Sequence, residues 1–227
     1  MSDDFDGLMK RIFGRAEPED LCAELEQAKV VTGNGTAIRH RLVDVDVYAE
    51  PDNAWYNKTL REQSARAAET LENERWWDFV DTHPKRNWPH ALEEIEAHAP
   101  ELAWCETVRN VWYLSDELSV NSVIWRRIFA NRNRAQQLMT PGETETFDAV
   151  GNPIEVFRGC LPKHVNGMSW STSRDAVEHF KREAGPGGVI YRGVVQKDDV
   201  IAYINPNNEE YEIIVLPEHV SQKEIVG

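Results

Sequence analysis

The pattern of hydrophobic and polar positions divides the chain into a helical first part and a strand-rich second part. In the first part apolar residues recur at helical spacing, which predicts helices over 19–28, 57–80, 101–114 and 119–138. Apolar and polar residues alternate over 43–48, which predicts a strand there. After Thr140-Pro141-Gly142 the pattern predicts strands, with the bounds 144–150, 154–157, 167–172, 189–195, 200–204 and 210–216.

One helix interrupts these strands, over 174–183. Thr172 and Asp175 have the spacing of a capping box, and Ala176, Val177 and Phe180 form its expected inward face. A run of helices followed by a run of strands predicts an α+β fold rather than a doubly wound parallel sheet. We therefore expect a mainly helical region over 1–143 and a β core over 144–227, and the helical region either stands alone or belongs to the same domain as the core.

The charge is strongly negative, at −14 for 227 residues. Such a protein is not drawn to nucleic acid or to an anionic membrane. The acidity lies mostly in residues 1–150, since 151–227 holds 11 acidic and 8 basic residues, and the last third suits an anionic ligand better. The helix over 119–138 carries four arginines on its outer side, which we interpret as a solvated face: Arg126, Arg127, Arg132 and Arg134.

Cysteine and histidine spacing favours no metal site. The three cysteines are far apart without a CxxC pair, and no HxxxH or HExxH occurs. No apolar run reaches the roughly 18 residues of a membrane span, and residues 1–14 lack the apolar core of a signal peptide. We expect a cytoplasmic protein without a membrane partner, and delivery into another cell without a classical signal remains open.

Three short motifs in the second part could carry chemistry. In the strand over 210–216, alternation places Glu210 and Glu212 on one face. Ser169, Ser171 and Ser173 form a row of small hydroxyl groups in the same way. The third motif is Arg158-Gly159, at the end of another predicted strand. The planar guanidinium of arginine suits phosphate oxygens, and the glycine lets a ligand approach the backbone. Each motif alone is also compatible with polar side chains that simply face solvent at the end or edge of a strand. A second Arg-Gly pair at 192–193 lies within a predicted strand and looks structural.

The order of the motifs is more informative than any one of them. Arg-Gly is followed 13 residues later by Ser171-Thr172-Ser173, and 41 residues after Ser171 by the second glutamate of Glu-x-Glu. From about 144 to 217 the chain resembles the R-S-E class of mono-ADP-ribosyltransferases. The resemblance implies an ADP-ribosyltransferase-like split β-sandwich that uses NAD⁺ as co-substrate and needs no metal.

The resemblance also implies a role for each motif residue. Arg158 looks like the arginine that holds the NAD⁺ phosphates, and Gly159 like the residue whose backbone binds the nicotinamide amide. Ser171 looks like the serine that orients the catalytic glutamate, Glu212. Glu210 takes the position that helps to deprotonate a guanidinium in arginine-modifying members, so the implied acceptor is a protein arginine.

These roles agree with the chemistry. Cleavage of the nicotinamide–ribose bond develops oxocarbenium character, which a fixed carboxylate stabilises. Three alternatives stay open on the sequence: an NAD glycohydrolase, transfer to a nucleic-acid base, and an inactive binding module of the same fold. The nucleic-acid alternative is disfavoured by the net charge of −14 and by Glu210. Phe180 and Trp170 are candidates for the aromatic ring that stacks on nicotinamide.

Overall fold

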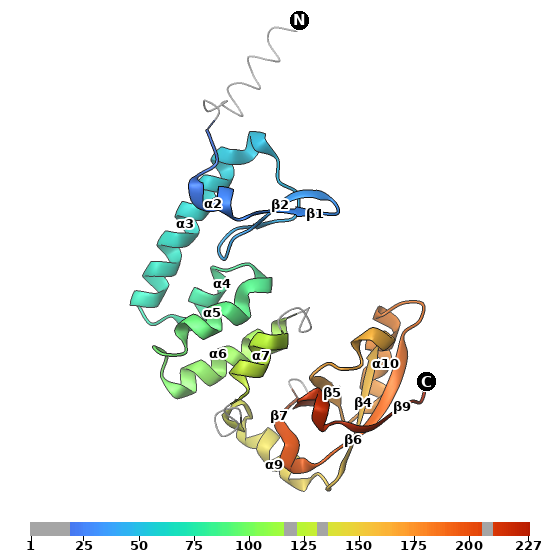
Figure 1. Cartoon of the computed structure of the whole chain (residues 1–227). Coiled ribbons are helices and arrows are strands. Elements are labelled where there is room, and N and C mark those ends of the chain that lie inside the picture. The colour runs from blue at the N-terminus through green and yellow to red at the C-terminus, as the bar shows by residue number, and fades with distance from the viewer. Residues whose placement is uncertain (1–18, 116–121, 131–135, 206–210) are drawn as a thin grey trace, which may run out of the picture. The chain divides into compact units, whose positions relative to one another are not determined.

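The computed structural model describes residues 19–115, 122–130, 136–205 and 211–227 (Figure 1). The chain divides into two compact units, Met1–Ala91 and Leu92–Gly227, and each is described by itself. Both combine helices with an antiparallel sheet, which confirms the α+β class. The division between the units falls within the helix over 88–95, inside the region 1–143 that the sequence pattern predicts to be mainly helical. No helix in the described ranges is long and apolar enough to cross a membrane.

The first unit is a small three-stranded sheet with helices. Its strands pair in the order β1-β2-β3, all antiparallel. The elements are α2 (Ala23–Gln27), β1 (Lys29–Thr32), β2 (Gly35–Arg39), β3 (Asp44–Val45), η1 (Glu50–Asp52), α3 (Asn53–Glu72), α4 (Trp76–Asp81), η2 (Lys85–Asn87) and α5 (Trp88–Ile95), the last of which spans the division between the units.

The single helix predicted over 57–80 is wrong, because the structure breaks it into α3 and α4. Glu74 has φ 54°, in the left-handed region that ends a helix. The Arg75 backbone N–H then donates to the Thr70 carbonyl at 2.8 Å, which closes the turn. The helical periodicity of the sequence continues across this break, and so the pattern concealed it.

The second unit contains five of the six strands predicted over 144–216, at 154–160, 169–171, 189–195, 200–204 and 212–215. Its elements are α6 (Glu101–Leu114), α7 (Ser122–Ile128), η3 (Gln136–Leu138), α9 (Pro141–Ala149), β4 (Ile154–Cys160), η4 (Pro162–His164), β5 (Ser169–Ser171), α10 (Arg174–Glu183), β6 (Val189–Val195), η5 (Lys197–Asp199), β7 (Val200–Ile204), β8 (Glu212–Val215), η7 (Pro217–His219) and β9 (Ser221–Ile225). One helix was predicted over 119–138, and the structure has α7 and the 3-10 helix η3 in this range. Residues 119–121 and 131–135 of the prediction lie outside the described residues.

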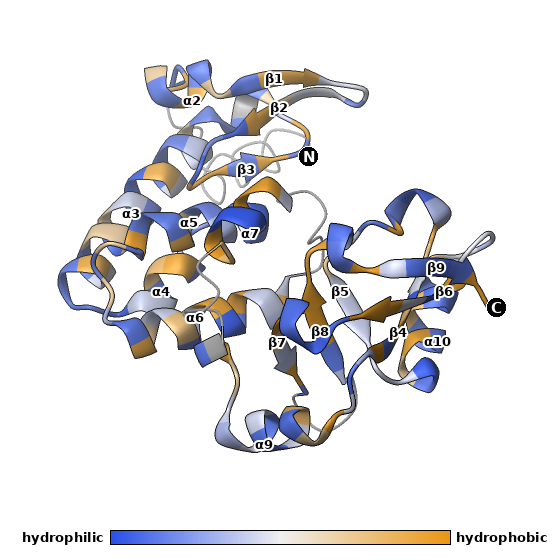
Figure 2. Ribbon diagram, turned by 60° about the horizontal axis from the view of Figure 1, so that its bottom comes forward, coloured by the Kyte–Doolittle hydropathy of each residue, from blue (hydrophilic) through white to orange (hydrophobic). Residues whose placement is uncertain are grey.

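The strands of the second unit form one antiparallel sheet in the order β7-β8-β5-β4-β6-β9. Its apolar positions, orange in Figure 2, run along β4 and β6. The buried core includes Val156 of β4, Trp170 of β5 and Ile213 of β8. The opposite face of β4 receives α10, whose backbone comes so close that a side chain at Gly159 would meet the Lys181 nitrogen at 2.7 Å. The three motif-bearing strands, β4, β5 and β8, are consecutive in the middle of this sheet.

The strand predicted over 144–150 is wrong, because this segment forms helix α9. Thr140 caps the helix: its hydroxyl accepts from the Glu143 N–H, and the Glu143 carboxylate accepts from the Thr140 N–H, which together make a capping box. Pro141 occupies the first turn, where a missing N–H costs nothing. The local capping chemistry therefore outweighs the weak alternation of the segment.

Helix α10 has the predicted bounds but a different cap. Ser173, not Thr172, is the N-cap residue, and its hydroxyl accepts from the Ala176 N–H at 3.3 Å. Val177 is buried as expected, whereas Phe180 is 43% exposed, so its predicted place in the core is wrong. Trp170 is fully buried, and its indole N–H donates to the Gly167 carbonyl.

Candidate active site

Ser171 and Glu212 are direct neighbours across two central strands. β5 and β8 pair antiparallel with Ser171 opposite Glu212, which brings their side chains to the same face with Cβ atoms about 5 Å apart. The two residues are 4% and 8% exposed, among the few buried polar or charged side chains of the described chain. The structure thus brings together two residues of the predicted site that lie 41 positions apart in sequence.

The hydroxyl of Ser171 is held by the start of α10. Its Oγ accepts from the Ser173 backbone N–H at 3.0 Å. The residue between them, Thr172, donates its backbone N–H to the Tyr211 carbonyl at 3.0 Å. The segment Ser171–Ser173 is therefore tied to the residue directly before Glu212, and this fixes the relative position of the two motifs.

The carboxylate of Glu212 has a partner that sequence reasoning missed. The indole N–H of Trp112, on α6, donates to Glu212 Oε2 at 3.1 Å. In the sequence, Trp112 is one of the apolar positions at helical spacing over 101–114. Periodicity shows that such a residue faces inward, but gives no information about a polar partner 100 residues away.

An aromatic cluster holds the Trp112 ring. Trp125 meets it edge-on at a centroid distance of 4.9 Å, and Phe129 does so at 5.2 Å. Trp125 and Phe129 are themselves stacked at 5.4 Å. All three side chains are buried. The donor of the Glu212 hydrogen bond is therefore fixed by packing on both sides.

Arg158 lies within β4, which continues to Cys160 beyond the predicted end at 157, next to the same pair of strands. Phe157 is the residue of β4 that pairs with Ser171, so alternation turns Arg158 to the other face of the strand. Its Nε donates to the His164 carbonyl at 3.1 Å, and its Nη1 donates to the Ser169 carbonyl. The guanidinium lies against Gly167, where a Cβ would collide with it.

The electrostatic surroundings of Arg158 include one residue of the Ser171–Glu212 pair. Burial lowers the pKa of the Arg158 guanidinium, while Cys160 and the Glu212 carboxylate act in the opposite direction and raise it. Burial also raises the pKa of the Cys160 thiol, and Arg158 lowers it. The arginine is thus a desolvated cation within the electrostatic reach of Glu212, without being its hydrogen-bond partner.

Glu210, the other carboxylate of the motif, lies outside the described residues. β8 begins at Glu212, and Tyr211 has φ 49°, which is not an extended conformation. The strand alternation that we used to place Glu210 beside Glu212 is therefore interrupted at Tyr211. Its role as the residue that activates the acceptor stays a prediction.

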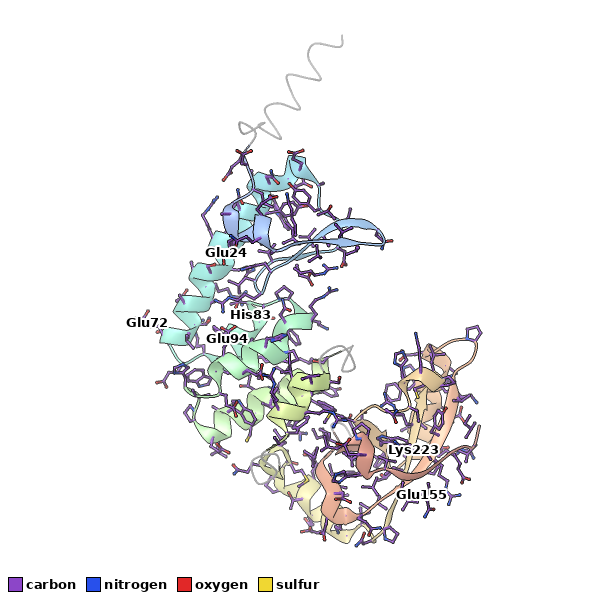
Figure 3. The ribbon with its side chains drawn as sticks, in the orientation of Figure 1. Glu24, Glu72, His83, Glu94, Glu155 and Lys223 are labelled. Atoms are coloured by element: carbon purple, nitrogen blue, oxygen red, sulfur yellow. The ribbon has the colours of Figure 1, made fainter. Side chains whose placement is uncertain are left out.

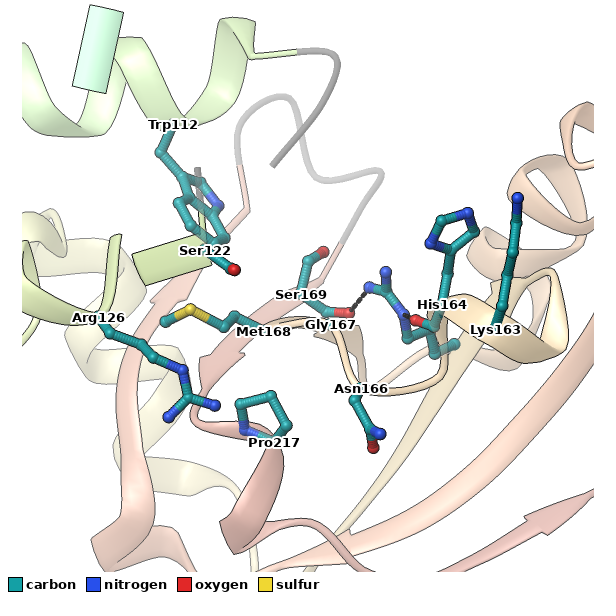
Figure 4. Close-up of a pocket in the computed structure, with 11 residues that line it drawn as sticks. Trp112, Ser122, Arg126, Lys163, His164, Asn166, Gly167, Met168, Ser169 and Pro217 are labelled. Carbon is teal, nitrogen blue, oxygen red and sulfur yellow. Dashed lines mark hydrogen bonds between the residues drawn. The ribbon is translucent and has the colours of Figure 1, made fainter. Parts of the chain in front are cut away.

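A pocket of about 180 Å³ adjoins Arg158 (Figure 4). Among the described residues its lining includes the cationic side chains Arg126, Arg158 and Lys163 and no carboxylate. Trp112 also lines it, together with Gly167, Met168 and Ser169. The volume is below the roughly 300–1,000 Å³ of typical small-molecule sites, so it suits one anionic portion of a larger ligand.

Two other arginines of the second unit, Arg126 and Arg192, have acidic partners. Arg126, which we interpreted as part of a solvated face, makes a bidentate pair with Glu218 at 2.7 and 2.9 Å and lines the pocket. Arg192 pairs with Glu155, labelled in Figure 3, at 2.6 Å and with Glu224 at 3.1 Å. Arg192 therefore has the surface ion pairs of a structural residue.

Within the described parts of the chain, no group of three or more His, Cys, Asp or Glu side chains is arranged to hold a metal ion. Comparisons with protein-family models, with curated proteins and with solved structures each find no match for this chain. The residues themselves, and the geometry that brings them together, therefore carry the functional argument.

Proposed function

We propose that the protein is a mono-ADP-ribosyltransferase that cleaves NAD⁺ and transfers ADP-ribose to a protein acceptor, with arginine as the favoured side chain. The observation that carries the proposal is the pairing of Ser171 with Glu212 on adjacent central strands, with Arg158 on the next strand. These are the three positions at which the sequence resembles the R-S-E transferases. The second unit would then have the split β-sandwich of that family.

Glu212 would stabilise the charge that develops when the nicotinamide–ribose bond breaks. As that bond lengthens, the ribose acquires oxocarbenium character, and a preorganised carboxylate in a site shielded from water lowers the energy of this state. Glu212 is 8% exposed, which provides the shielding. The leaving nicotinamide is neutral and needs no strong acid. The electron pair of the broken bond leaves with the nicotinamide nitrogen.

Arg158 would bind the phosphates of NAD⁺. Two of its donors already serve the His164 and Ser169 carbonyls, and a guanidinium has five, so three can serve a ligand. Among the described residues, the pocket beside it is also lined by Lys163 and by Arg126, whose guanidinium is paired with Glu218. This charge pattern supports an anionic ligand at Arg158.

Glu210 would act on the acceptor rather than on NAD⁺. A guanidinium has a pKa above about 12 and is not nucleophilic while protonated, so a carboxylate that takes its proton has a clear task. Water needs less help once the cation has formed. Glu210→Gln should therefore lose transfer to arginine but keep much of the NAD⁺ cleavage, as measured by paired assays of labelled acceptor and free ADP-ribose.

The proposal is tested with NAD⁺ labelled in its ADP-ribose portion and a cell lysate. We expect label on protein, and release of nicotinamide that falls at least about 100-fold in Glu212→Gln. Glu155→Gln, an exposed carboxylate on β4, is the matched control and should behave as the wild type. Label only in free ADP-ribose would make the protein a glycohydrolase, and label on nucleic acid would change the acceptor class. A folded Glu212→Gln protein with normal turnover would refute the assignment.

A further inference from the structure

The hydrogen bond between Trp112 and Glu212 joins two elements that are far apart in the sequence. The donor is the indole Nε1 of Trp112 on α6, and the acceptor is Glu212 Oε2 at the first residue of β8, at 3.1 Å. Trp112 is 2% and Glu212 is 8% exposed. A hydrogen bond to a carboxylate at such low exposure is stronger than one on the surface, because little water competes for the donor.

The Trp112 side chain is fixed by packing, and a glutamate side chain has more torsions than an indole. Trp125 and Phe129 pack edge-on against the indole at 4.9 and 5.2 Å and fix its orientation. A glutamate has three side-chain torsions, and the last of them, which turns the carboxylate plane, is broad. The rigid donor therefore determines where the flexible acceptor lies.

We propose that Trp112 is a positioning residue for the reaction: its indole N–H sets the orientation of the Glu212 carboxylate towards the ribose of NAD⁺. This inference rests on the proposed function. Each carboxylate oxygen can accept two hydrogen bonds, so the bond from Trp112 leaves acceptor capacity for a substrate. Trp112 acts through Glu212 and does not itself take part in bond breaking.

Trp112 also connects this carboxylate with the pocket. It is one of the residues that line the 180 Å³ pocket, which also contains Arg158. Burial lowers the pKa of the Arg158 guanidinium, and the Glu212 carboxylate acts against this lowering, which places the two groups within electrostatic reach of each other. The Trp112 indole therefore both bonds to the Glu212 carboxylate and forms part of the pocket lining, which is the location that a positioning residue requires.

Trp125 provides a matched control for the packing contribution. It belongs to the same aromatic cluster, it is 1% exposed, and its ring contacts Trp112 directly. Its indole N–H has no hydrogen-bond partner among the described residues. Trp112→Phe and Trp125→Phe therefore remove similar packing from the same cluster, but only the first removes the donor to Glu212.

The kinetic experiment compares the two variants in the full chain. For nicotinamide release, Trp112→Phe should lower kcat about 10- to 100-fold, the range for loss of one hydrogen bond to a charged group, with little change in KM. Trp125→Phe should keep kcat close to the wild type. Equal losses in the two variants, or a loss confined to KM, overturn the inference. A rise in kcat in Trp112→Phe also overturns it, because the bond would then be inhibitory.

A spectroscopic measurement tests the contact without any turnover. The Trp112 and Trp125 indole N–H resonances in a ¹H–¹⁵N spectrum are assigned from triple-resonance spectra of the labelled wild type, so that no Trp112 variant is needed. We expect the Trp112 resonance to move in Glu212→Gln by more than the Trp125 resonance does, and an unchanged Trp112 resonance overturns the inference even if Trp112→Phe fails to fold. If the wild type releases no nicotinamide but the Trp112 resonance moves in Glu212→Gln, the proposed function is refuted and the hydrogen bond between Trp112 and Glu212 is supported. If the wild type releases nicotinamide but Trp112→Phe and Trp125→Phe have the same kcat, only the positioning role of Trp112 is refuted.

Discussion

Two arginines in similar local sequence, Arg158 and Arg192, have different surroundings in the second unit. Each is followed by a glycine on a central strand. Arg192 is paired with Glu155 and Glu224 at the surface. Arg158 donates to the His164 and Ser169 carbonyl oxygens and lies in the pocket. A cation whose charge is not cancelled by a nearby carboxylate pair is the better partner for a phosphate.

Arg158→Ala should therefore weaken NAD⁺ binding. Loss of a charge-assisted contact is worth about 1.5–3 kcal/mol, which corresponds to roughly a 10- to 100-fold rise in Kd. Calorimetry in a Glu212→Gln background measures binding without turnover. Arg192→Ala is the control and should leave Kd unchanged. If Arg192→Ala weakens binding and Arg158→Ala does not, the phosphates bind at β6 and the assignment of Arg158 is wrong.

The residues of the candidate site were predictable to different degrees. Arg158, Ser171 and Glu212 could be proposed because their order along the chain resembles a known family. The pairing of Ser171 with Glu212 could not be derived, since strand register is set by contacts across the sheet. Trp112 was hidden for a related reason: its polar partner lies 100 residues away, while its helix shows only that the side chain is buried.

At the scale of elements, Gly159 connects β4 with α10. A Cβ at this position would meet the α10 backbone, including the Lys181 nitrogen at 2.7 Å, and backbone atoms of a helix cannot move aside cheaply. The glycine therefore has a packing role that the motif resemblance did not reveal. Its proposed part in binding the nicotinamide amide would be additional to this role.

Gly159→Ala should accordingly destabilise the fold by about 1–3 kcal/mol, the range for overpacking. Chemical denaturation is the measurement. Gly151→Ala, where a Cβ meets nothing within 4 Å, is the control and should be close to neutral. If Gly159→Ala retains wild-type stability and loses only NAD⁺ binding, the close approach of α10 to β4 is not as described.

Glu143 joins three elements of the second unit. It makes a bidentate pair with Arg109 of α6 at 2.6 and 2.8 Å, and it accepts the backbone N–H groups of Asn205 at 2.7 Å and Thr140 at 2.8 Å. Burial raises the pKa of the Glu143 carboxyl, but the Arg109 guanidinium and these N–H groups outweigh it and lower the pKa to about 2. Helices α6 and α9 and the end of β7 therefore share one ionised carboxylate.

This depressed pKa predicts an acid-dependent loss of stability. In the unfolded chain the group has its ordinary pKa of 4.5, so its stabilising contribution is complete above that pH and disappears as the pH falls towards 2. At about 1.36 kcal/mol per unit, the contribution at pH 7 is on the order of 3 kcal/mol. Glu143→Gln should be destabilised by a few kcal/mol at pH 7, and the difference from the wild type should shrink between about pH 4.5 and 2.

Denaturation curves at pH 7 and pH 3 test this. Glu145→Gln, an exposed carboxylate on the same helix, is the control and should show no such convergence. A Glu143→Gln protein that keeps a constant difference from the wild type at both pH values would contradict the assigned pKa.

The elements themselves were predicted where side-chain pattern and local chemistry agree. Strands β6 and β7 have the predicted bounds, and so do helices α6 and α10. The segment of α9 was predicted as a strand because its apolar and polar residues alternate weakly. The residues Thr140-Pro141 and Glu143 are typical of a helix N-terminus and are the better signal. The break at Glu74 has no comparable signal, since glutamate rarely adopts a left-handed conformation.

At the scale of the whole molecule, the division between the units separates the candidate site from the N-terminal part. The described residues to which we assign roles, Arg158, Gly159, Ser171, Glu212 and Trp112, all belong to Leu92–Gly227. This unit has a six-stranded sheet and a buried core of its own. The proposed cleavage of NAD⁺ therefore assigns no role to a described residue of the first unit.

A fragment of residues 84–227 should fold cooperatively and release nicotinamide at a rate similar to that of the full chain. The cut precedes Pro84 so that α5, which spans the division, stays whole together with its buried Leu92 and Ile95. The measurements are a denaturation curve and the nicotinamide assay, followed by label transfer in a lysate. A fragment that cleaves NAD⁺ but transfers no label would assign acceptor recognition to the first unit. A folded fragment without nicotinamide release would show that residues 1–83 complete the active site, because each of the described residues proposed for bond breaking would still be present.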